Sequence, residues 1–289
     1  VSRGLGDVYK RQDGFLSNIH YPFANGNKAS QLNYAIKKIH AETDINLKNT
    51  YFAIYDIDSM PSKETISEFN ELINSEYSRT NQYPIVVQQP SFFYKNFNKK
   101  NLIMQIEALA ATRRVLQIEI PNQLQTNKPH KWHVPYAYCV GHGLFVYSDY
   151  LVNNGLFPEP HEDVLFGLKL SYLSNAIYPL KCFDDCEVPD STKELIVQGG
   201  RWFLNSLLFF PFYNSLIKLP TKSKVRLLSL LSGGILDCLS WFRYLLILII
   251  GLILLSFHAI NIWSILLMIF LFYFDSGIGL LETYFFSRE

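Results

Sequence analysis

The sequence predicts an α/β domain that is followed by a strongly apolar helical region. From Asp13 to about Trp202, short apolar runs alternate with amphipathic segments, which is typical of strands and helices that share one core. Hydrophobic residues make up 49% of the 289 residues and aromatic residues 15%, and the excess is concentrated after Trp202. We therefore expect residues 13–202 to form one domain and residues 203–289 a separate apolar region.

The domain begins with a predicted helix and a predicted strand. In Lys28–His40 the apolar residues recur at helical spacing, and the β-rich run Tyr51–Tyr55 ends directly at Asp56. The later elements are a helix from Glu64 to about Ser75, a strand over Pro84–Gln89, a helix over Lys99–Gln117, a strand over Tyr136–Tyr147 and a helix from Glu162 to about Ser174. Because ligands of open α/β sheets bind beside the carboxyl ends of strands, Asp56 is a candidate functional residue.

The region after Trp202 predicts an interfacial helix and then membrane spans. Phe203–Leu219 contains a proline and two asparagines, so a broken interfacial helix is favoured over a clean span. Leu239–Phe257 and about Ile260–Leu281 are each long enough to cross ~30 Å of hydrocarbon at ~1.5 Å per residue. A buried helical hairpin of a soluble protein is the weaker alternative, because such helices rarely carry so little charge over so long a stretch.

A basic cluster before the first predicted span sets the expected orientation. Its members are Lys218, Lys222, Lys224 and Arg226. Lys and Arg concentrate on the cytosolic side of membranes, so we expect a multi-pass membrane protein whose α/β domain faces the cytosol.

Composition excludes some classes of partner. A formal net charge of +1 gives no electrostatic basis for nucleic-acid binding, which usually needs a clustered basic face. The four cysteines are too few and too scattered for a disulfide framework, and Cys182 and Cys186 have no second Cys/His pair at zinc-site spacing. Val1–Gln12 resembles a translated sequencing adapter, so we set it apart and expect the chain to start inside a longer protein.

Two acidic motifs carry the chemistry that the sequence suggests. Asp56-Ile57-Asp58 places two carboxylates on one side of extended chain, where they suit a hard divalent cation, although a turn or a helix cap is the ordinary alternative. Glu162-Asp163 is suited to general-base chemistry on a hydroxyl group. Two acids at a helix start are also explained by the helix dipole alone.

Three further motifs supply cations, an aromatic ring and a glycine-rich loop. Gln198-Gly199-Gly200-Arg201-Trp202 combines a guanidinium that fits phosphate oxygens with an indole face that fits a sugar ring, although Arg and Trp also anchor proteins at membrane interfaces. Lys28 and His142 are the other candidates. Lys28 opens a helix as many exposed lysines do, and His142 lies between two glycines in what is otherwise a flexible loop.

In this order, the motifs resemble those of the membrane-bound branch of family-two glycosyltransferases, which includes cellulose, chitin and hyaluronan synthases. The resemblance covers about Tyr21 to Leu281, and Gly26 to Asn33 is similar to the family's G-K-A-x-x-L-N stretch. It implies a GT-A (Rossmann-like) nucleotide-sugar domain that carries out an inverting hexosyl or N-acetylhexosaminyl transfer. The donor would be a cytosolic nucleotide sugar, and the acceptor a polysaccharide or a lipid-linked glycan at the membrane.

The resemblance also implies a role for each candidate residue. Asp163 is the general base; Lys28, Asp56, Asp58, Gln198 and Arg201 bind the donor diphosphate; Asp56 and Asp58 hold Mg²⁺ or Mn²⁺; and His142, Glu162 and Trp202 line the acceptor site. The chain departs from the family at His161, where threonine is common, and at Gly199-Gly200, where basic residues are often found. We expect the family's first strand, with the acidic residue that reads the nucleobase, to lie upstream of this chain.

Two other classes of function remain open from the residues. One is a metal-dependent hydrolase that uses the acids together with histidines at positions His130, His133, His142 or His161. The other is a non-catalytic membrane scaffold that keeps the same fold. Release of a nucleoside diphosphate distinguishes a transferase from both.

Overall fold

The computed structural model describes residues 19–43, 46–57, 59–128, 133–218, 223–258 and 260–286. The adapter-like segment Val1–Gln12 lies outside these residues. So do Asp58, His130 and Lys222, and the expectations for them stay predictions.

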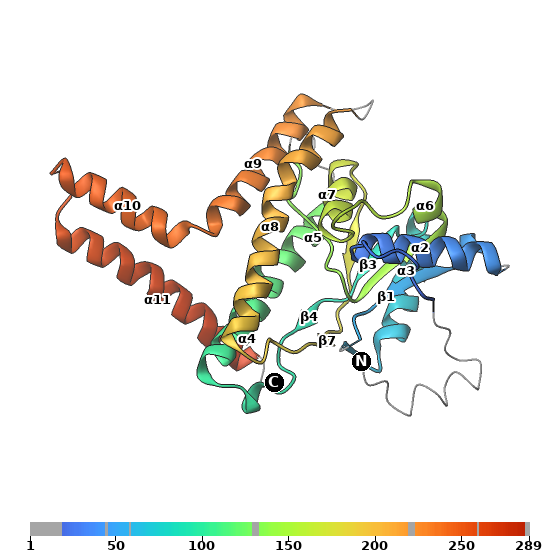
Figure 1. Cartoon of the computed structure of the whole chain (residues 1–289), viewed down its shortest axis with the longest axis horizontal. Coiled ribbons are helices and arrows are strands. Elements are labelled where there is room, and N and C mark those ends of the chain that lie inside the picture. Colours follow the sequence, from blue (N-terminus) through green and yellow to red (C-terminus); the bar gives the residue numbers. More distant parts are fainter. Residues whose placement is uncertain are drawn as a thin grey trace.

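The chain folds as a mixed α/β structure in which helices surround a four-stranded sheet (Figure 1). The strand order is β1 (Tyr51–Ile54), β5 (Leu144–Tyr147), β3 (Val86–Gln88) and β6 (Ile177–Pro179). β5 runs antiparallel to both of its neighbours, whereas β3 and β6 are parallel. As a result, β1, β3 and β6 all end at the same edge of the sheet, where β5 begins.

A second, smaller sheet continues from that edge. It contains β2 (Met60–Pro61), β7 (Asp184–Asp185) and β4 (Ser91–Phe92), with β7 in the middle. β4 follows β3 after two residues, and β7 follows β6 after four, so both sheets are built from the same stretches of chain.

The helices occupy most of the remaining chain. They are α2 (Lys28–Glu42), η1 (Leu47–Asn49), α3 (Thr65–Thr80), η2 (Phe97–Lys99), α4 (Leu102–Arg114), η3 (Val115–Glu119), α5 (Ile120–Thr126), α6 (Ser148–Asn153), α7 (Val164–Tyr172), α8 (Thr192–Ile217), α9 (Lys224–Ser240), α10 (Arg243–Ser256) and α11 (Ile262–Phe286).

Alternating side chains of the strands bury the two faces of the sheet in different clusters. Val86 and Val146 pack with Ile36 of α2 and residues of α6 and α7. Their strand neighbours Val87 and Phe145 pack instead against Phe69 of α3. This period of two is the expected pattern for strands covered on both faces. Packing against helices on both faces fixes the position of the sheet beneath the edge where the candidate residues lie.

Several elements differ from the predicted ones in extent. Only Leu144–Tyr147 of the expected strand over Tyr136–Tyr147 pairs with other strands. The helix expected over Lys99–Gln117 starts at Leu102 and continues through a π-helical turn to Thr126. The helix expected to end near Ser75 runs on to Thr80, where Asn81 adopts a left-handed conformation that terminates it.

The expected break after Trp202 is absent from α8, which runs from Thr192 to Ile217 with Pro211 inside it. Proline removes one backbone hydrogen-bond donor from α8. Near the end of the same helix, Leu216 is buried in one cluster with Leu230 of α9, and this packing holds α8 and α9 together. Gln198, Arg201 and Trp202 therefore lie inside one continuous helix rather than at its boundary.

The C-terminal helices extend away from the domain as a hairpin of α10 and α11, and α11 returns to α4 (Figure 1). Among the described residues, no helix alone has the length and apolar character to cross a membrane. The helices Lys224–Ser240 and Leu245–Ser256 meet that requirement only as a pair, and they are bent by 82° relative to each other. The first predicted span, Leu239–Phe257, thus falls across this bend, with α10 covering only 14 residues.

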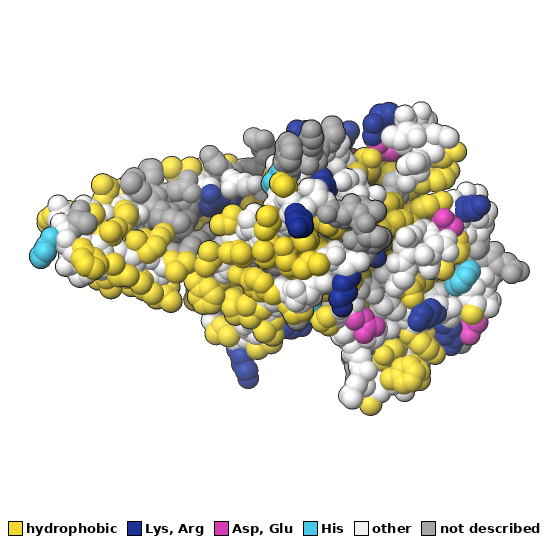
Figure 2. Space-filling view, turned by 90° about the horizontal axis from the view of Figure 1, so that it is seen from above, with side chains coloured by type: hydrophobic (Ala, Val, Ile, Leu, Met, Phe, Trp, Pro, Cys, Tyr) yellow, Lys and Arg dark blue, Asp and Glu magenta, His cyan; other side chains and the backbone are white. Residues whose placement is uncertain are grey.

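Hydrophobic side chains are exposed along the hairpin, and Figure 2 shows them gathered at the end of the molecule that α10 and α11 form. The exposed residues on the two helices include Leu245, Leu248, Ile249, Leu252, Ile253, Trp263, Leu266, Leu267 and Phe270.

Candidate functional site

The candidate site forms at the edge where β1, β3 and β6 end. Ile54 pairs with Leu144, and Leu144 pairs with Gln88, so the ends of three strands lie side by side. Asp56 follows β1 by two residues, and the loop with His142 directly precedes β5. The register of the sheet therefore brings together two segments that are far apart in sequence.

Lys28 reaches this edge from the start of α2. The helix begins there because the Asn27 side chain accepts a hydrogen bond from the Ser30 amide at 2.8 Å. The Lys28 ammonium lies 2.7 Å from Asp56 Oδ1 and donates a second hydrogen bond, also 2.7 Å, to the Gly141 carbonyl. It is 3.7 Å from Glu162 Oε1. One cation thus connects three separate parts of the chain.

Glu162 and Asp163 approach the same point from the start of α7. Asp163 caps this helix, since its Oδ1 accepts a hydrogen bond from the Val164 amide at 2.7 Å. A β-carbon on Gly141 would lie 2.9 Å from Asp163 Oδ2, 3.1 Å from the Lys28 ammonium and 3.3 Å from Glu162 Oε1. Three of the predicted site residues, Lys28, Glu162 and Asp163, therefore surround Gly141, and a fourth, Asp56, joins them through its contact with Lys28.

The glycine-rich loop allows this close approach. Gly143 has a φ of 61°, and a β-carbon there would lie 2.8 Å from the Gln89 carbonyl oxygen. The Gln89 amide donates to the Gly143 carbonyl at 2.7 Å, which fixes the loop against β3. Glycine suits both the left-handed backbone and the lack of space.

Burial controls the charges of the two acids. The pKa of Glu162 is raised to about 7, first by burial and then by the charge of Asp163, while the charge of Lys28 opposes the shift. The pKa of Asp163 is also raised by burial, against hydrogen bonds from backbone amides and the charge of Lys28. Burial lowers the pKa of the neighbouring His161. Near neutral pH, the pair therefore retains part of a proton.

Of the two predicted metal ligands Asp56 and Asp58, the structure describes Asp56. The Asp56 side chain is 46% exposed, so an ion in solvent has access to it, while Asp58 lies outside the described residues. One Asp56 oxygen contacts Lys28. Within the described parts of the chain, the group of side chains that could hold a metal ion is a different one: His142, Asp184 and Cys186.

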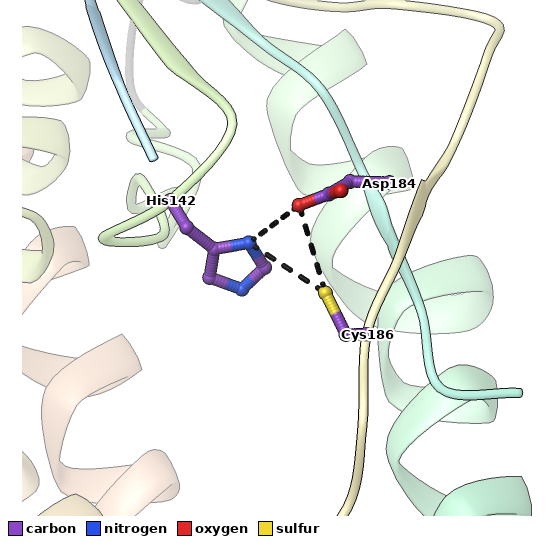
Figure 3. A group of neighbouring side chains, drawn as sticks. All are labelled: His142, Asp184 and Cys186. Atoms are coloured by element: carbon purple, nitrogen blue, oxygen red, sulfur yellow. Dashed lines mark hydrogen bonds and ion pairs between the residues drawn. The ribbon is translucent and has the colours of Figure 1, made fainter. Parts of the chain in front are cut away.

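The His142 ring points into this second group, as Figure 3 shows. The Nδ1 atom is 3.2 Å from Asp184 Oδ2 and 3.7 Å from Cys186 Sγ, and Nε2 is 3.1 Å from Ser91 Oγ. Sequence reasoning missed Asp184 and set Cys186 aside, because their partner lies more than forty positions upstream and no local spacing reveals it.

A partly buried polar network supports the chain that leads into the loop. Arg114 Nη2 donates to the Tyr138 hydroxyl at 2.9 Å, which in turn donates to Glu119 Oε1 at 3.0 Å. Burial raises the pKa of Glu119, and the charge of Arg114 opposes the shift. The sequence contains no local signal for this network, since its members come from α4, η3 and the segment before β5.

The candidate residues on α8 stand apart from the group around Gly141. Arg201 is exposed, Trp202 is partly buried, and Gln198 has a buried Oε1 atom without a hydrogen-bond partner. Among the described residues, no hydrogen bond or ion pair joins these three to Lys28, Asp56 or Asp163. Their predicted roles stay predictions.

Comparisons with known proteins do not add to this description. No protein-family model matches the sequence, and no match was found among the curated proteins.

Proposed function

We propose that the chain is an inverting glycosyltransferase of GT-A fold that uses a nucleotide-sugar donor. The observation that carries the proposal is the convergence of Lys28, Glu162 and Asp163 around Gly141, with Asp56 held beside them by Lys28. The resemblance to family-two glycosyltransferases implies donor binding, acceptor binding and proton removal for these residues. A site for sugar transfer needs these three activities within a few ångströms of each other.

Lys28 and Asp56 form the donor half of the proposed site. Breaking the bond between the sugar and a diphosphate leaves negative charge on the leaving group, which the Lys28 ammonium stabilises. Asp56 and Asp58 would hold Mg²⁺ or Mn²⁺, which supplies further positive charge to the diphosphate. In the structure Lys28 contacts Asp56 at 2.7 Å, so its ammonium already stands beside the proposed metal ligand.

Asp163 is the proposed general base. Its raised pKa makes the carboxylate a stronger base toward an acceptor hydroxyl than an exposed aspartate. The capping hydrogen bond from Val164 orients the group, with Oδ2 toward Gly141. Glu162 lies beside it and contributes to acceptor binding. Attack on the face of the sugar opposite the diphosphate then inverts the anomeric centre.

Gln198, Arg201 and Trp202 complete the proposed site from α8. The guanidinium would bind phosphate oxygens, and the indole would stack on the acceptor sugar. Arg201 is exposed and accessible to a ligand. The proposed role for the His142 segment is to line the acceptor site through its main chain, because its ring contacts Asp184.

We also propose that the C-terminal helices attach the protein to the cytosolic face of a membrane as a multi-pass segment. The exposed apolar side chains of α10 and α11 support this proposal, because apolar side chains gathered on one exposed surface are typical of sites that contact a membrane or a partner. Lys218, Lys224 and Arg226 supply basic charge for the cytosolic side.

Two of the four histidines named for the hydrolase alternative lie away from the acids around Gly141, whereas His161 directly precedes Glu162. His142 contacts Asp184 and Cys186, and His133 is 3.1 Å from Ser229 Oγ, so neither ring joins the acids around Gly141.

The test is an assay of the chain in membrane vesicles with a panel of nucleotide sugars and Mg²⁺. The proposal predicts that one donor yields nucleoside diphosphate together with an equal amount of sugar attached to an acceptor. Removal of the divalent ion by a chelator should stop the reaction. Release of free sugar alone, or no product with any donor, would contradict the proposal.

A further inference from the structure

We propose that His142, Asp184 and Cys186 form a zinc-binding site that is separate from the proposed Mg²⁺ or Mn²⁺ position at Asp56. The three side chains converge between the glycine-rich loop and the small sheet, and Figure 3 shows their ligand atoms pointing toward one another. All three residues are at most partly exposed, and Asp184 is 0% exposed.

The distances between the ligand atoms fit one tetrahedral ion. Zinc bonds of about 2.0–2.1 Å to nitrogen and oxygen and about 2.3 Å to sulfur place tetrahedral ligands roughly 3.4 Å apart for an N/O pair. The same geometry places sulfur about 3.6 Å from either of the other atoms. The observed separations are 3.2 Å for Nδ1 to Oδ2, 3.7 Å for Sγ to Nδ1 and 3.7 Å for Sγ to Oδ2. An ion therefore fits with only small movements.

The backbone holds each ligand in place. The Asp184 amide donates to the Pro90 carbonyl and the Cys186 amide to the Phe92 carbonyl, each at 2.9 Å. Residues two apart on extended chain point to the same side, so Asp184 and Cys186 face His142 together. The His142 carbonyl accepts a hydrogen bond of 2.8 Å from the Gln88 side chain.

Ser91 provides the second-shell contact that zinc-bound histidines usually have. Its hydroxyl is 3.1 Å from His142 Nε2. A proton on Nε2 donated to Ser91 leaves the lone pair of Nδ1 directed at the cluster, which is the tautomer that a metal ion requires.

Charge provides a further reason for an ion. Asp184 Oδ1 is buried and has no hydrogen-bond partner, and no ammonium or guanidinium of the described residues forms an ion pair with this carboxylate. Hydrogen bonds alone satisfy the cluster poorly, since the Nδ1 atom either donates one proton or accepts one and faces both other ligands. A divalent cation neutralises the buried carboxylate and engages all three atoms at once.

The ligand types select zinc over magnesium. Thiolate and imidazole favour Zn²⁺, whereas Mg²⁺ prefers oxygen ligands and retains water. Three protein ligands leave a fourth position for water or another ligand. The ion would fasten the loop that contains His142 to β7, and the same loop carries the Gly141 carbonyl that contacts Lys28. We therefore assign it a structural, positioning role.

The test is a titration of the purified whole chain, stripped of metal by a chelator, with Co²⁺ as a spectroscopic substitute for zinc. We expect visible bands of tetrahedral cobalt and an ultraviolet thiolate-to-cobalt band that saturate at about one ion per chain. Zn²⁺ should abolish both, and excess Mg²⁺ should not. Lack of a thiolate band in the wild-type chain would overturn the proposal whatever the variants do.

Matched variants identify the ligands. Cys186→Ser should remove the thiolate band, whereas Cys182→Ser should retain it, because the Cys182 thiol lies near Gln89 and Thr65 rather than His142. Ser91→Ala is a milder change that keeps all three ligands and should weaken Zn²⁺ binding by about 10- to 100-fold. A thiolate band that survives in Cys186→Ser but disappears in Cys182→Ser would show that Cys182 is the ligand and would overturn the proposed site. These readouts do not depend on glycosyl transfer.

Discussion

The Lys28 ammonium lies 2.7 Å from Asp56 Oδ1, although the two residues are 28 positions apart and belong to different elements. Lys28 opens α2, while Asp56 follows β1. The contact places a cation beside the carboxylate to which we propose a role in metal and donor binding. The Lys28 side chain is 39% exposed and is therefore accessible to an incoming diphosphate.

Replacing Lys28 by methionine should weaken binding of nucleoside diphosphate by roughly 10- to 100-fold, because a charge-assisted hydrogen bond contributes about 1.5–3 kcal/mol. Calorimetric titration with Mg²⁺ present measures the change. Lys38→Met is the matched control on the same helix, since Lys38 pairs with Glu42 at 3.9 Å, away from the site. Equal affinities for the Lys28 variant and the wild type would assign Lys28 a purely structural role.

Gly141→Ala should reduce transfer much more than it reduces stability. The added β-carbon would meet Asp163 Oδ2 at 2.9 Å and the Lys28 ammonium at 3.1 Å, both of which are ends of side chains that can shift. Displacement of reacting groups by about 1 Å costs ~100-fold in rate. Gly277→Ala, in open space on α11, should leave the rate unchanged. Similar rates for the two variants would show that the group around Gly141 is not catalytic.

Glu162 should make the protein less stable as pH rises from about 4.5 to about 7. Its pKa is raised from 4.5 to about 7, so over this range the folded state keeps a proton that the unfolded state loses. The free energy of unfolding then falls with increasing pH, by no more than ~3 kcal/mol, and levels off above the folded pKa.

Urea unfolding at a series of pH values measures this contribution. Glu162→Gln should flatten the curve between these limits, whereas Glu71→Gln, at an exposed position on α3, should keep the wild-type slope. A curve for Glu162→Gln that parallels the wild type throughout would contradict the raised pKa.

The C-terminal helices should keep the chain in the membrane fraction after washing with alkaline carbonate. Burial of the exposed apolar side chains of α10 and α11 in lipid removes them from water. Replacing Leu248 and Leu252 by aspartate should increase extraction, because a charged side chain in the hydrocarbon core costs about 2.5–3.5 kcal/mol. Complete extraction of the wild-type chain would contradict membrane insertion.

Local sequence signals predicted the elements that carry the site. The apolar spacing in Lys28–His40 and the β-rich run at Tyr51 identified α2 and β1, and the acids at 162 and 163 identified the start of α7. These signals act within a few residues. They were less accurate for Tyr136–Tyr147, where apolar residues pack beneath α7 and α8 without pairing as a strand along most of their length.

Contacts between distant segments could not be predicted in the same way. The register that places Ile54 beside Leu144 brings Asp56 and Gly141 to one edge of the sheet, where both contact Lys28, and no local pattern specifies it. His142 and Cys186 likewise lie 44 positions apart in sequence and meet only in the folded chain, where β7, which precedes Cys186, pairs with β4. The position of Trp202 inside α8 was missed because composition changes there while the helical backbone continues.

The most direct test of the account compares Asp163→Asn with the wild-type chain in one preparation. The amide keeps the shape of the side chain but cannot accept the acceptor's proton. We predict that turnover, measured as nucleoside diphosphate released from the active donor, falls by ~10²- to ~10⁴-fold while nucleoside diphosphate affinity changes by less than about threefold. Turnover of Asp163→Asn within about threefold of the wild type would contradict the assignment of Asp163 as the base.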